Sequence, residues 1–242
     1  MNRLCTTWAV TLLMIPVLTA NAQKNYLHWK TSMSEHLIIY YSPQSSLNDK
    51  TTLDKFIAGH ERAISNTISV LQEKIRLPPK IYMYVYEDNN EAYPYIHRLA
   101  GHADPEIGVI HTRLNQTYGH ELTHVISWRI GHAIKFLSEG LAVALDMSGY
   151  NHYAKAKEYL SSRNVKRLST LTLMNNLNEN EDWYPLAGGY VSFLIQKYGI
   201  AQFKKLWITK SEAEYEHAVR RIYHKSPRDL DLEFVQFLNA GQ

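Results

Sequence analysis

The most informative stretch of the sequence is His120-Glu121-Leu122-Thr123-His124, an H-E-x-x-H pentad within a segment that is compatible with a helix. On a helix, side chains four residues apart lie on one face, so His120 and His124 can offer two imidazole nitrogens to one metal ion. Glu121 lies about 100° around the helix, where its carboxylate can reach a water molecule on that metal. The pentad therefore predicts a helix that carries part of a metal site.

A second segment supplies a carboxylate shortly after the pentad. Residues 136–142 are Phe-Leu-Ser-Glu-Gly-Leu-Ala, so Glu139 precedes a glycine and an apolar run that is typical of another helix. A surface helix with two solvated histidines is the alternative, and the ordered pair of segments disfavours it. Two histidines and one carboxylate leave one position open, as in catalytic zinc sites. We expect His120, His124 and Glu139 to bind one Zn²⁺ per chain, with Glu121 as the general base.

The two segments together resemble those of the gluzincin zinc metallopeptidases, specifically the small secreted peptidase MA-like domains. Residues 184–194 are Tyr-Pro-Leu-Ala-Gly-Gly-Tyr-Val-Ser-Phe-Leu and are similar to a tyrosine-bearing helix of that group, and residues 196–199, Gln-Lys-Tyr-Gly, match its ending. The resemblance covers roughly residues 36 to 238. It implies a zincin-like fold and hydrolysis of peptide bonds by a water molecule that zinc activates.

The sequence departs from this group next to the third ligand. Thermolysin-like members carry an aspartate one helical turn after the glutamate ligand, where it orients a zinc histidine, and this chain has Val143 there. Asp146 comes a further turn along and is not an obvious replacement. The interval between the pentad and Glu139 is also shorter than in the longest-studied members. We therefore expect the surroundings of the ligands to differ from the family more than the ligands do.

Tyr184 is the first candidate for a group that stabilises the oxyanion together with the metal. The resemblance indicates it, because Tyr184 begins the third matching stretch. A well-placed donor of this kind contributes about 3 kcal/mol to catalysis. Tyr190 and His111 are the other candidates, although most of the 17 tyrosines in the chain must be structural.

A short strand is predicted directly before the pentad, over Gly108-Val109-Ile110-His111. A strand at the edge of a sheet offers unpaired N–H and C=O groups, to which an extended peptide can add as one more strand. We therefore expect Gly108, Val109 and Ile110 to bind substrate through their backbone. An ordinary turn at Gly108 fits the sequence equally well.

The order of the predicted elements indicates an α+β fold in a single domain over residues 23–242. Besides 108–111, strands are predicted over 36–41 and 81–86, and a long amphipathic helix over 53–75 separates these two. Strands come early and helices late, which is typical of a small mixed sheet followed by a helical lobe, with the zinc in the cleft between them. The later helices are predicted over 116–130, 134–147, 151–162, 185–198, 201–208, 212–223 and 228–239.

Residues 1–22 have the pattern of a cleavable signal peptide. Asn2-Arg3 gives a positive start, residues 4–19 are mostly apolar, and Ala20-Asn21-Ala22 is an A-x-A cleavage site. Cleavage after Ala22 would remove Cys5, the only cysteine, so we expect core burial without a disulfide to hold the mature chain. Export to the periplasm or the cell exterior is expected, with no stable membrane span in the mature chain. An uncleaved anchor is the alternative.

The charge and the motifs limit the partners. A formal charge of +3 over 242 residues is too small to indicate a nucleic-acid partner. The expected partner is a peptide or protein substrate. Two alternatives stay open. One is a catalytically silent, zinc-containing module that binds a peptide, which would have no need of Glu121. The other is a hydrolase of a different amide, such as a cell-wall peptide cross-link.

Overall fold

The structure is a computed structural model that describes residues 28–72, 77–96, 101–147, 149, 151–163, 169–170, 174 and 183–240. The predicted signal peptide, residues 1–22, lies outside the described residues. Within the described ranges, no helix combines the length and the apolar character that crossing a membrane requires.

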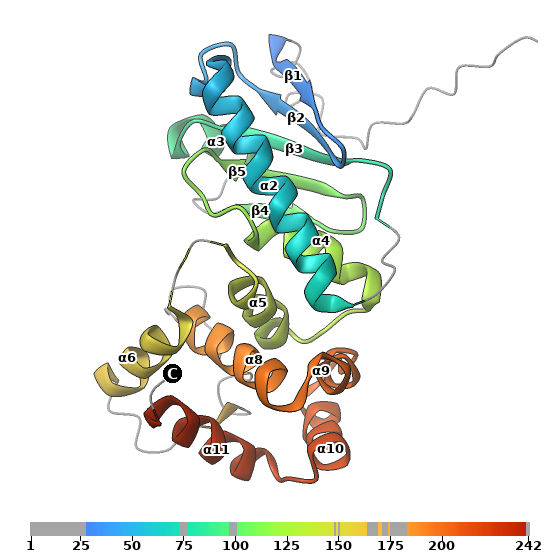
Figure 1. The fold of residues 1–242 in the computed structure, drawn as a ribbon, viewed down its shortest axis with the longest axis vertical. Helices are drawn as coiled ribbons and strands as arrows, with labels where there is room; N and C mark the ends of the chain where they lie inside the picture. The colour runs from blue at the N-terminus through green and yellow to red at the C-terminus, as the bar shows by residue number, and fades with distance from the viewer. Residues whose placement is uncertain are drawn as a thin grey trace, which may run out of the picture.

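A five-stranded mixed sheet forms from the N-terminal part of the chain (Figure 1). The order across the sheet is β1-β2-β3-β5-β4, with β2, β3 and β5 parallel and the two outer strands antiparallel to their neighbours. The three predicted strands are confirmed as β2, β3 and β5, within two residues at each end. The strands are β1 (Lys30–Met33), β2 (Leu37–Tyr41), β3 (Ile81–Tyr86), β4 (His102–Asp104) and β5 (Val109–Arg113).

Strand β5 is an inner strand, so the expectation that residues 108–111 form a sheet edge is wrong. Ile110 lies opposite Met83 of β3 on one side and opposite Ala103 of β4 on the other. The backbone of Val109 and Ile110 therefore faces strands of the protein on both sides, and no peptide can add there. On this side of the sheet the edge strand is β4. It has only three residues, which are too few to show an apolar alternation in the sequence.

Gly108 belongs to the turn that connects β4 to β5. Its N–H donates to the Asp104 carbonyl at 3.0 Å, and its carbonyl accepts from the Tyr82 N–H at 2.9 Å. Its φ of +70° lies in the left-handed region, which glycine adopts without strain. The alternative that Gly108 is a turn glycine is therefore confirmed.

Helix α2 (Lys50–Leu71) lies across one face of the sheet (Figure 1). It begins where the Asp49 side chain accepts the N–H of Thr52 at 2.8 Å, and it ends at Gln72, whose φ is 48°. The helix predicted over 53–75 is confirmed with both ends shifted towards the N-terminus. Its apolar side joins one buried cluster with alternate residues of β2 and β3, which explains the amphipathic pattern.

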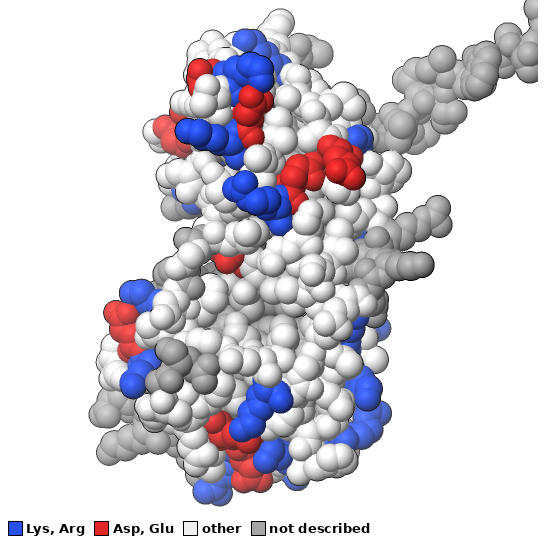
Figure 2. Space-filling model, viewed as in Figure 1, with Lys and Arg blue, Asp and Glu red and all other residues white. Residues whose placement is uncertain are grey.

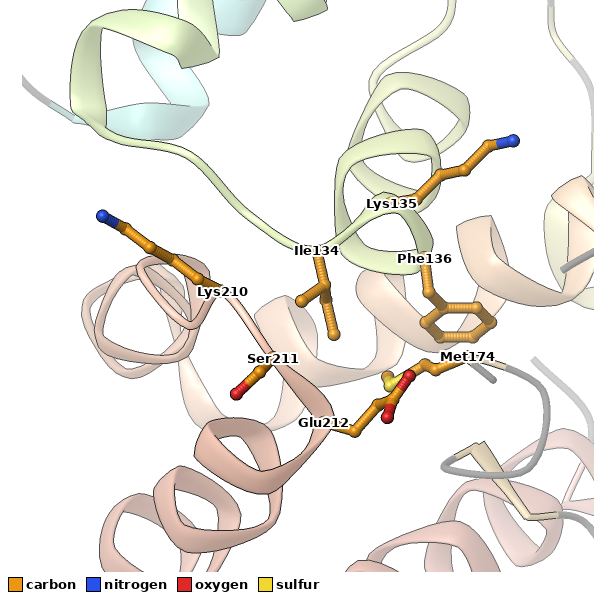
Figure 3. Close-up of a pocket in the computed structure, with 7 residues that line it drawn as sticks. All are labelled: Ile134, Lys135, Phe136, Met174, Lys210, Ser211 and Glu212. Atoms are coloured by element: carbon orange, nitrogen blue, oxygen red, sulfur yellow. The ribbon is translucent and has the colours of Figure 1, made fainter. Parts of the chain in front are cut away.

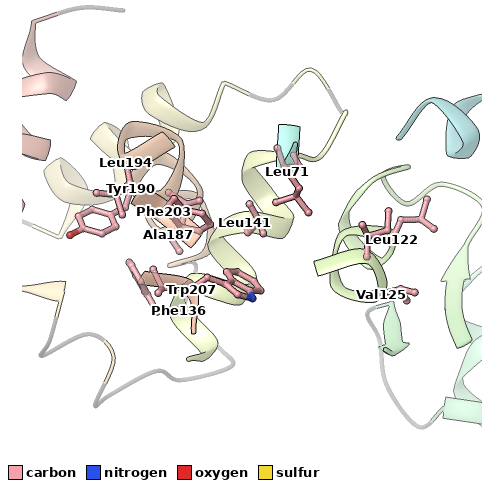
Figure 4. Close-up of a cluster of buried hydrophobic side chains, with 14 of the residues drawn as sticks. Leu71, Leu122, Val125, Phe136, Leu141, Ala187, Tyr190, Leu194, Phe203 and Trp207 are labelled. Carbon is pink, nitrogen blue, oxygen red and sulfur yellow. The ribbon is translucent and has the colours of Figure 1, made fainter. Parts of the chain in front are cut away.

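The remaining chain is helical, as predicted, and its main helices match the predicted ranges within a few residues at each end. One buried cluster of apolar side chains includes residues of α2 and α4 and continues into the helical part (Figure 4). The mixed α+β class is therefore confirmed. The helices not yet given are η2 (Ser46–Asn48), α3 (Asn89–Ile96), α4 (His120–Ser127), η3 (Trp128–Ile130), α5 (Lys135–Ala144), α6 (His152–Ser162), α8 (Tyr184–Tyr198), α9 (Ile200–Trp207), α10 (Glu212–Tyr223) and α11 (Pro227–Asn239).

Two close contacts fix how the central helices meet. A Cβ atom built on Gly140 of α5 would stand 2.6 Å from the Ala187 carbonyl oxygen of α8, and one built on Gly188 would stand 2.3 Å from Val143 Cγ1. The two helices can therefore approach this closely only because both positions are glycine. In Figure 1, α5 lies where the sheet-containing part with α4 meets the helical part with α8.

Candidate metal centre

His120, His124 and Glu139 come together at the junction of α4 and α5. Each offers one ligand atom, and these atoms all lie within 4.8 Å of one another. The Nε2 atoms of His120 and His124 lie 3.2 Å and 3.4 Å from Glu139 Oε2. Among the described residues, this is the only group of three or more metal-binding side chains with such spacing. The three residues picked from the sequence therefore form a group that could hold a metal ion.

The packing of α4 explains why the two histidines face the junction. Leu122, Val125 and Ile126 are at most 1% exposed and hold the opposite side of the helix in the core. At its first turn the helix meets the end of α5, since a Cβ atom on Gly119 would stand 2.9 Å from the Leu145 carbonyl oxygen. The core side of α4 and the glycine at its start thus set the position of the histidine face.

The electrostatics of the group favour an ionised carboxylate. Burial alone would raise the pKa of Glu139, but hydrogen bonds and charges from His120 and His124 outweigh it and lower the pKa to about 2. Burial also acts to lower the pKa of His120, and the hydrogen bond to Glu139, followed by the charges of nearby carboxylates, raises it. A charged carboxylate facing two imidazoles is the donor set that divalent transition metals bind.

Ser138 contacts the ring of His124, the second histidine of the group. Its Oγ lies 3.3 Å from His124 Nδ1, the ring nitrogen that does not face Glu139. Such a contact fixes the ring orientation of a histidine ligand. Ser138 was not predicted from the sequence. The available signal was its position next to Glu139, because a residue adjacent to a ligand on one helix can reach the neighbouring helix.

Asp146 lies near the first histidine. Its charge is one of those that raise the pKa of His120, and near His152 at the start of α6 it only partly offsets the burial that lowers the pKa of that histidine. A Cβ atom on Gly119 would stand 3.2 Å from Asp146 Cα, so the end of α5 is in contact with the start of α4. Val143, where the resembled family has an aspartate, is a packing residue against α8.

Glu121 lies next to the ligand group without belonging to it. Its charge raises the pKa of His120. A Cβ atom built on Gly101, directly before β4, would stand 2.5 Å from Glu121 Oε1. The carboxylate therefore lies against the residue that directly precedes the edge strand.

Tyr184 is brought to the same place by the start of α8. Its ring centroid lies 6.1 Å from that of His120, and its other face stacks on Trp183 with centroids 4.5 Å apart. Pro185 is at the first turn of the helix, where its missing N–H costs no hydrogen bond. Of the candidates for oxyanion stabilisation, Tyr184 is the one whose ring packs beside a predicted ligand.

The other two candidates are engaged elsewhere. The Tyr190 hydroxyl is fully buried in the helical part and lies 2.8 Å from the Tyr215 hydroxyl. His111 Nδ1 lies 2.7 Å from the Tyr86 hydroxyl, and its ring stacks on Tyr84 on the sheet. Burial, followed by the charge of His102, lowers the pKa of His111 to about 4. Both side chains therefore have partners away from the three metal-binding side chains.

A cavity of about 350 Å³ lies away from the metal-binding group, between the N-terminal ends of α5 and α10 (Figure 3). Ile134, Phe136 and Met174 give it an apolar lining, and Ser211 and Glu212 lie at its α10 side. None of the metal-binding side chains lines it, so this cavity is not the candidate site. The side chains that the sequence predicted to bind metal lie instead on α4 and α5, and the Tyr184 ring of α8 lies beside them.

The comparisons with known proteins add no relative. No protein-family model matches the chain, and no curated protein is similar to it in sequence. What the candidate site can do therefore follows from its own residues, which are two histidines, a half-buried ionised carboxylate, a second carboxylate beside them and a tyrosine.

Proposed function

We propose that this protein is an exported zinc metallopeptidase of the gluzincin type that hydrolyses peptide bonds. The observation that carries the proposal is the His120, His124 and Glu139 group with Glu121 beside it. A structural zinc is closed by four protein ligands, whereas catalytic zinc has three and keeps one position for water or substrate. A zinc site between the sheet-containing part and the helical part would make the fold zincin-like.

The ligand types support zinc as the metal. The two histidine nitrogens lie 3.2 Å and 3.4 Å from Glu139 Oε2, close enough for all three side chains to bind one ion. Two imidazoles with one carboxylate are also ligands that zinc accepts readily.

In the proposed reaction, Glu121 and Tyr184 each have a separate role beside the metal. Bound zinc would polarise the substrate carbonyl and lower the pKa of the attacking water to about 7. In this mechanism Glu121 would take a proton from that water and deliver it to the leaving amine, so that the C–N bond breaks with the amine protonated. Tyr184 would donate its hydroxyl proton in a hydrogen bond to the oxyanion.

Replacing Tyr184 by Phe tests the last of these roles. The ring contact with His120 is kept and only the hydroxyl is lost, so we expect kcat to fall about a hundredfold with KM little changed. Tyr153→Phe is the control, because that hydroxyl bonds Gln196 on the helical part, at 2.8 Å. Steady-state kinetics on a fluorogenic peptide measures both. Equal kcat in the two variants would remove Tyr184 from the mechanism.

Replacing Asp146 by Asn tests the surroundings of the first ligand. A carboxylate that orients a metal-binding histidine raises metal affinity about tenfold to a hundredfold, so we expect a loss in that range. Competition with a chromogenic chelator measures the zinc affinity. Asp54→Asn, on the exposed side of α2, is the matched control. An affinity equal to that of the control variant would exclude Asp146 from the metal site.

We place an extended substrate along β4, in place of the residues of β5 that were first expected to bind it. Among the described strands β4 pairs only with β5, and it packs against α4, which carries the histidines. Pairing with its free side would hold the scissile bond beside Glu121 while asking little of the substrate side chains. Peptides with one N-methylated amide test this. Loss of cleavage at alternating positions is expected, and position-independent cleavage would exclude strand pairing.

On the face drawn in Figure 2, basic and acidic side chains both occur over the sheet-containing part, and several basic side chains adjoin one another along the edge of the helical part. The proposal of a peptide substrate rests on the residues of the candidate site and not on this charge distribution. Export rests on the pattern of residues 1–22, and N-terminal sequencing of the mature protein checks it, with Gln23 as the expected first residue.

One experiment separates this function from its alternatives. The mature chain is purified, its zinc content is measured, and it is incubated with an unstructured protein, a peptide library and peptidoglycan fragments. We expect one zinc per chain and cleavage of peptides that a chelator abolishes. Cleavage of the peptidoglycan fragments alone would identify a cell-wall amide hydrolase. Zinc with peptide binding and no turnover would identify a silent binding module.

A further inference from the structure

The Glu121 carboxylate lies against a glycine whose missing side chain makes room for it. A Cβ atom built on Gly101 would stand 2.5 Å from Glu121 Oε1 and 3.1 Å from Glu121 Cδ. Real Cβ atoms essentially never come within 3.0 Å of another heavy atom. Any side chain at position 101 would therefore push this carboxylate out of its place.

Gln116 places a second polar group around the same glycine. Its Oε1 would stand 2.9 Å from the Cβ atom of a residue at position 101. This oxygen accepts the backbone N–H of Arg113 at 2.9 Å and the hydroxyl of Thr112 at 3.1 Å. The end of β5 thus holds the amide by its oxygen. The Gln116 side chain is therefore fixed beside the space that Gly101 leaves.

The backbone of Gly101 is not the reason for a glycine there. Gly101 is not among the glycines with positive φ, so alanine can adopt its conformation. The cost of a side chain at this position falls on the Glu121 and Gln116 side chains. A substitution can therefore displace the carboxylate while the backbone of β4 stays in place.

We propose that Gly101 and Gln116 form a seat that positions the Glu121 carboxylate. Gly101 leaves the space that the carboxylate occupies, and the Gln116 side chain, held by the end of β5, borders that space and limits where the carboxylate can move. Both are positioning residues, since neither touches the substrate or the metal. The inference rests on the proposed function, in which Glu121 is the general base. A reacting group misplaced by about 1 Å can cost about a hundredfold in rate, so such a seat has a measurable effect.

Gly101→Ala tests the seat by kinetics. We expect zinc content and the unfolding temperature to stay close to those of the wild type, and kcat to fall about a hundredfold with KM little changed. Gln116→Ala should lower kcat by a smaller factor, because it removes a restraint and adds no clash. In a Glu121→Gln background, Gly101→Ala should change the residual rate no further, since the group that it displaces is no longer a base.

Binding of a peptide hydroxamate gives a second readout that needs no turnover. The hydroxamate binds a metal, and its hydroxyl can donate to a neighbouring carboxylate. Gly101→Ala should weaken binding in the wild-type background and leave it unchanged in the Glu121→Gln background. If Gly101→Ala does not fold, Gln116→Ala carries the same comparison.

The outcomes distinguish the seat from the proposed function. Wild-type kcat and hydroxamate affinity in Gly101→Ala would overturn the seat, and so would equal losses in both backgrounds, which would indicate a general loosening of the site. A zinc-loaded wild type that cleaves no peptide would overturn the proposed function instead. In that case the hydroxamate comparison still decides whether Gly101 and Gln116 position the carboxylate.

Discussion

Glu121→Gln is expected to keep one zinc per chain and to lose peptide hydrolysis by at least about a hundredfold. Glutamine has nearly the shape of glutamate, but its amide cannot take a proton from water. The Glu121 side chain is outside the ligand group and lies beside His120, so the metal should still bind. Zinc analysis of the purified variant, together with kcat/KM on a fluorogenic peptide, measures both parts of the expectation.

The control for this variant is Glu35→Gln, which makes the same chemical change on a side chain that is 83% exposed. It should keep both zinc and activity. Near-normal turnover in a zinc-loaded Glu121→Gln protein would refute the mechanism. The variant also bears on the silent binding module, because a module of that kind would bind peptides equally well with Gln at position 121.

The candidate ligand group could be predicted from the sequence because its grouping follows from local geometry. His120 and His124 share a helix face through their spacing alone, and the neighbouring helix that carries Glu139 is adjacent in the chain. The amphipathic pattern likewise predicted α2, since its apolar side records the sheet that it covers. These features need only the period of a helix and a short connection.

The surroundings of the site could not be predicted in the same way. Ser138, Asp146 and Gly101 matter through which atoms the folded chain brings near His124, His120 and Glu121, and no local period encodes such approaches. The edge strand β4 could not be predicted for a related reason. Its three residues are too few to show an alternating pattern, so the sequence gives no sign of the strand that covers β5.

Tyr184 and Tyr190 show how little sequence separates two residues with different surroundings. They lie on one helix, six positions apart, and both occur in the stretch that resembles the family motif. The first is at the start of α8, with its ring beside that of His120. The second is fully buried, and its hydroxyl contacts that of Tyr215. Only the packing of α8 against its neighbours decides between the two roles.

Glu139→Ala is expected to lower zinc affinity by more than about a hundredfold, the upper range for loss of a residue that merely supports a ligand. Two imidazoles remain, and two ligands from one helix hold zinc weakly. The half-buried, ionised carboxylate is also the group that His120 and His124 both face. The variant removes the negative charge that brings the two rings and the metal together. Chelator competition measures the affinity, and hydrolysis should fall in proportion to the zinc that is lost.

Two further variants show whether this loss is specific to the ligand. Glu158→Ala removes an exposed glutamate from α6 and should leave zinc binding unchanged. His124→Ala should match Glu139→Ala, because both leave two of the three donors. Circular dichroism of the metal-free proteins checks that the fold is kept, so that a loss of metal is not a loss of structure. Full zinc occupancy in either ligand variant, at metal concentrations near those of the protein, would mean that the metal is bound by other residues.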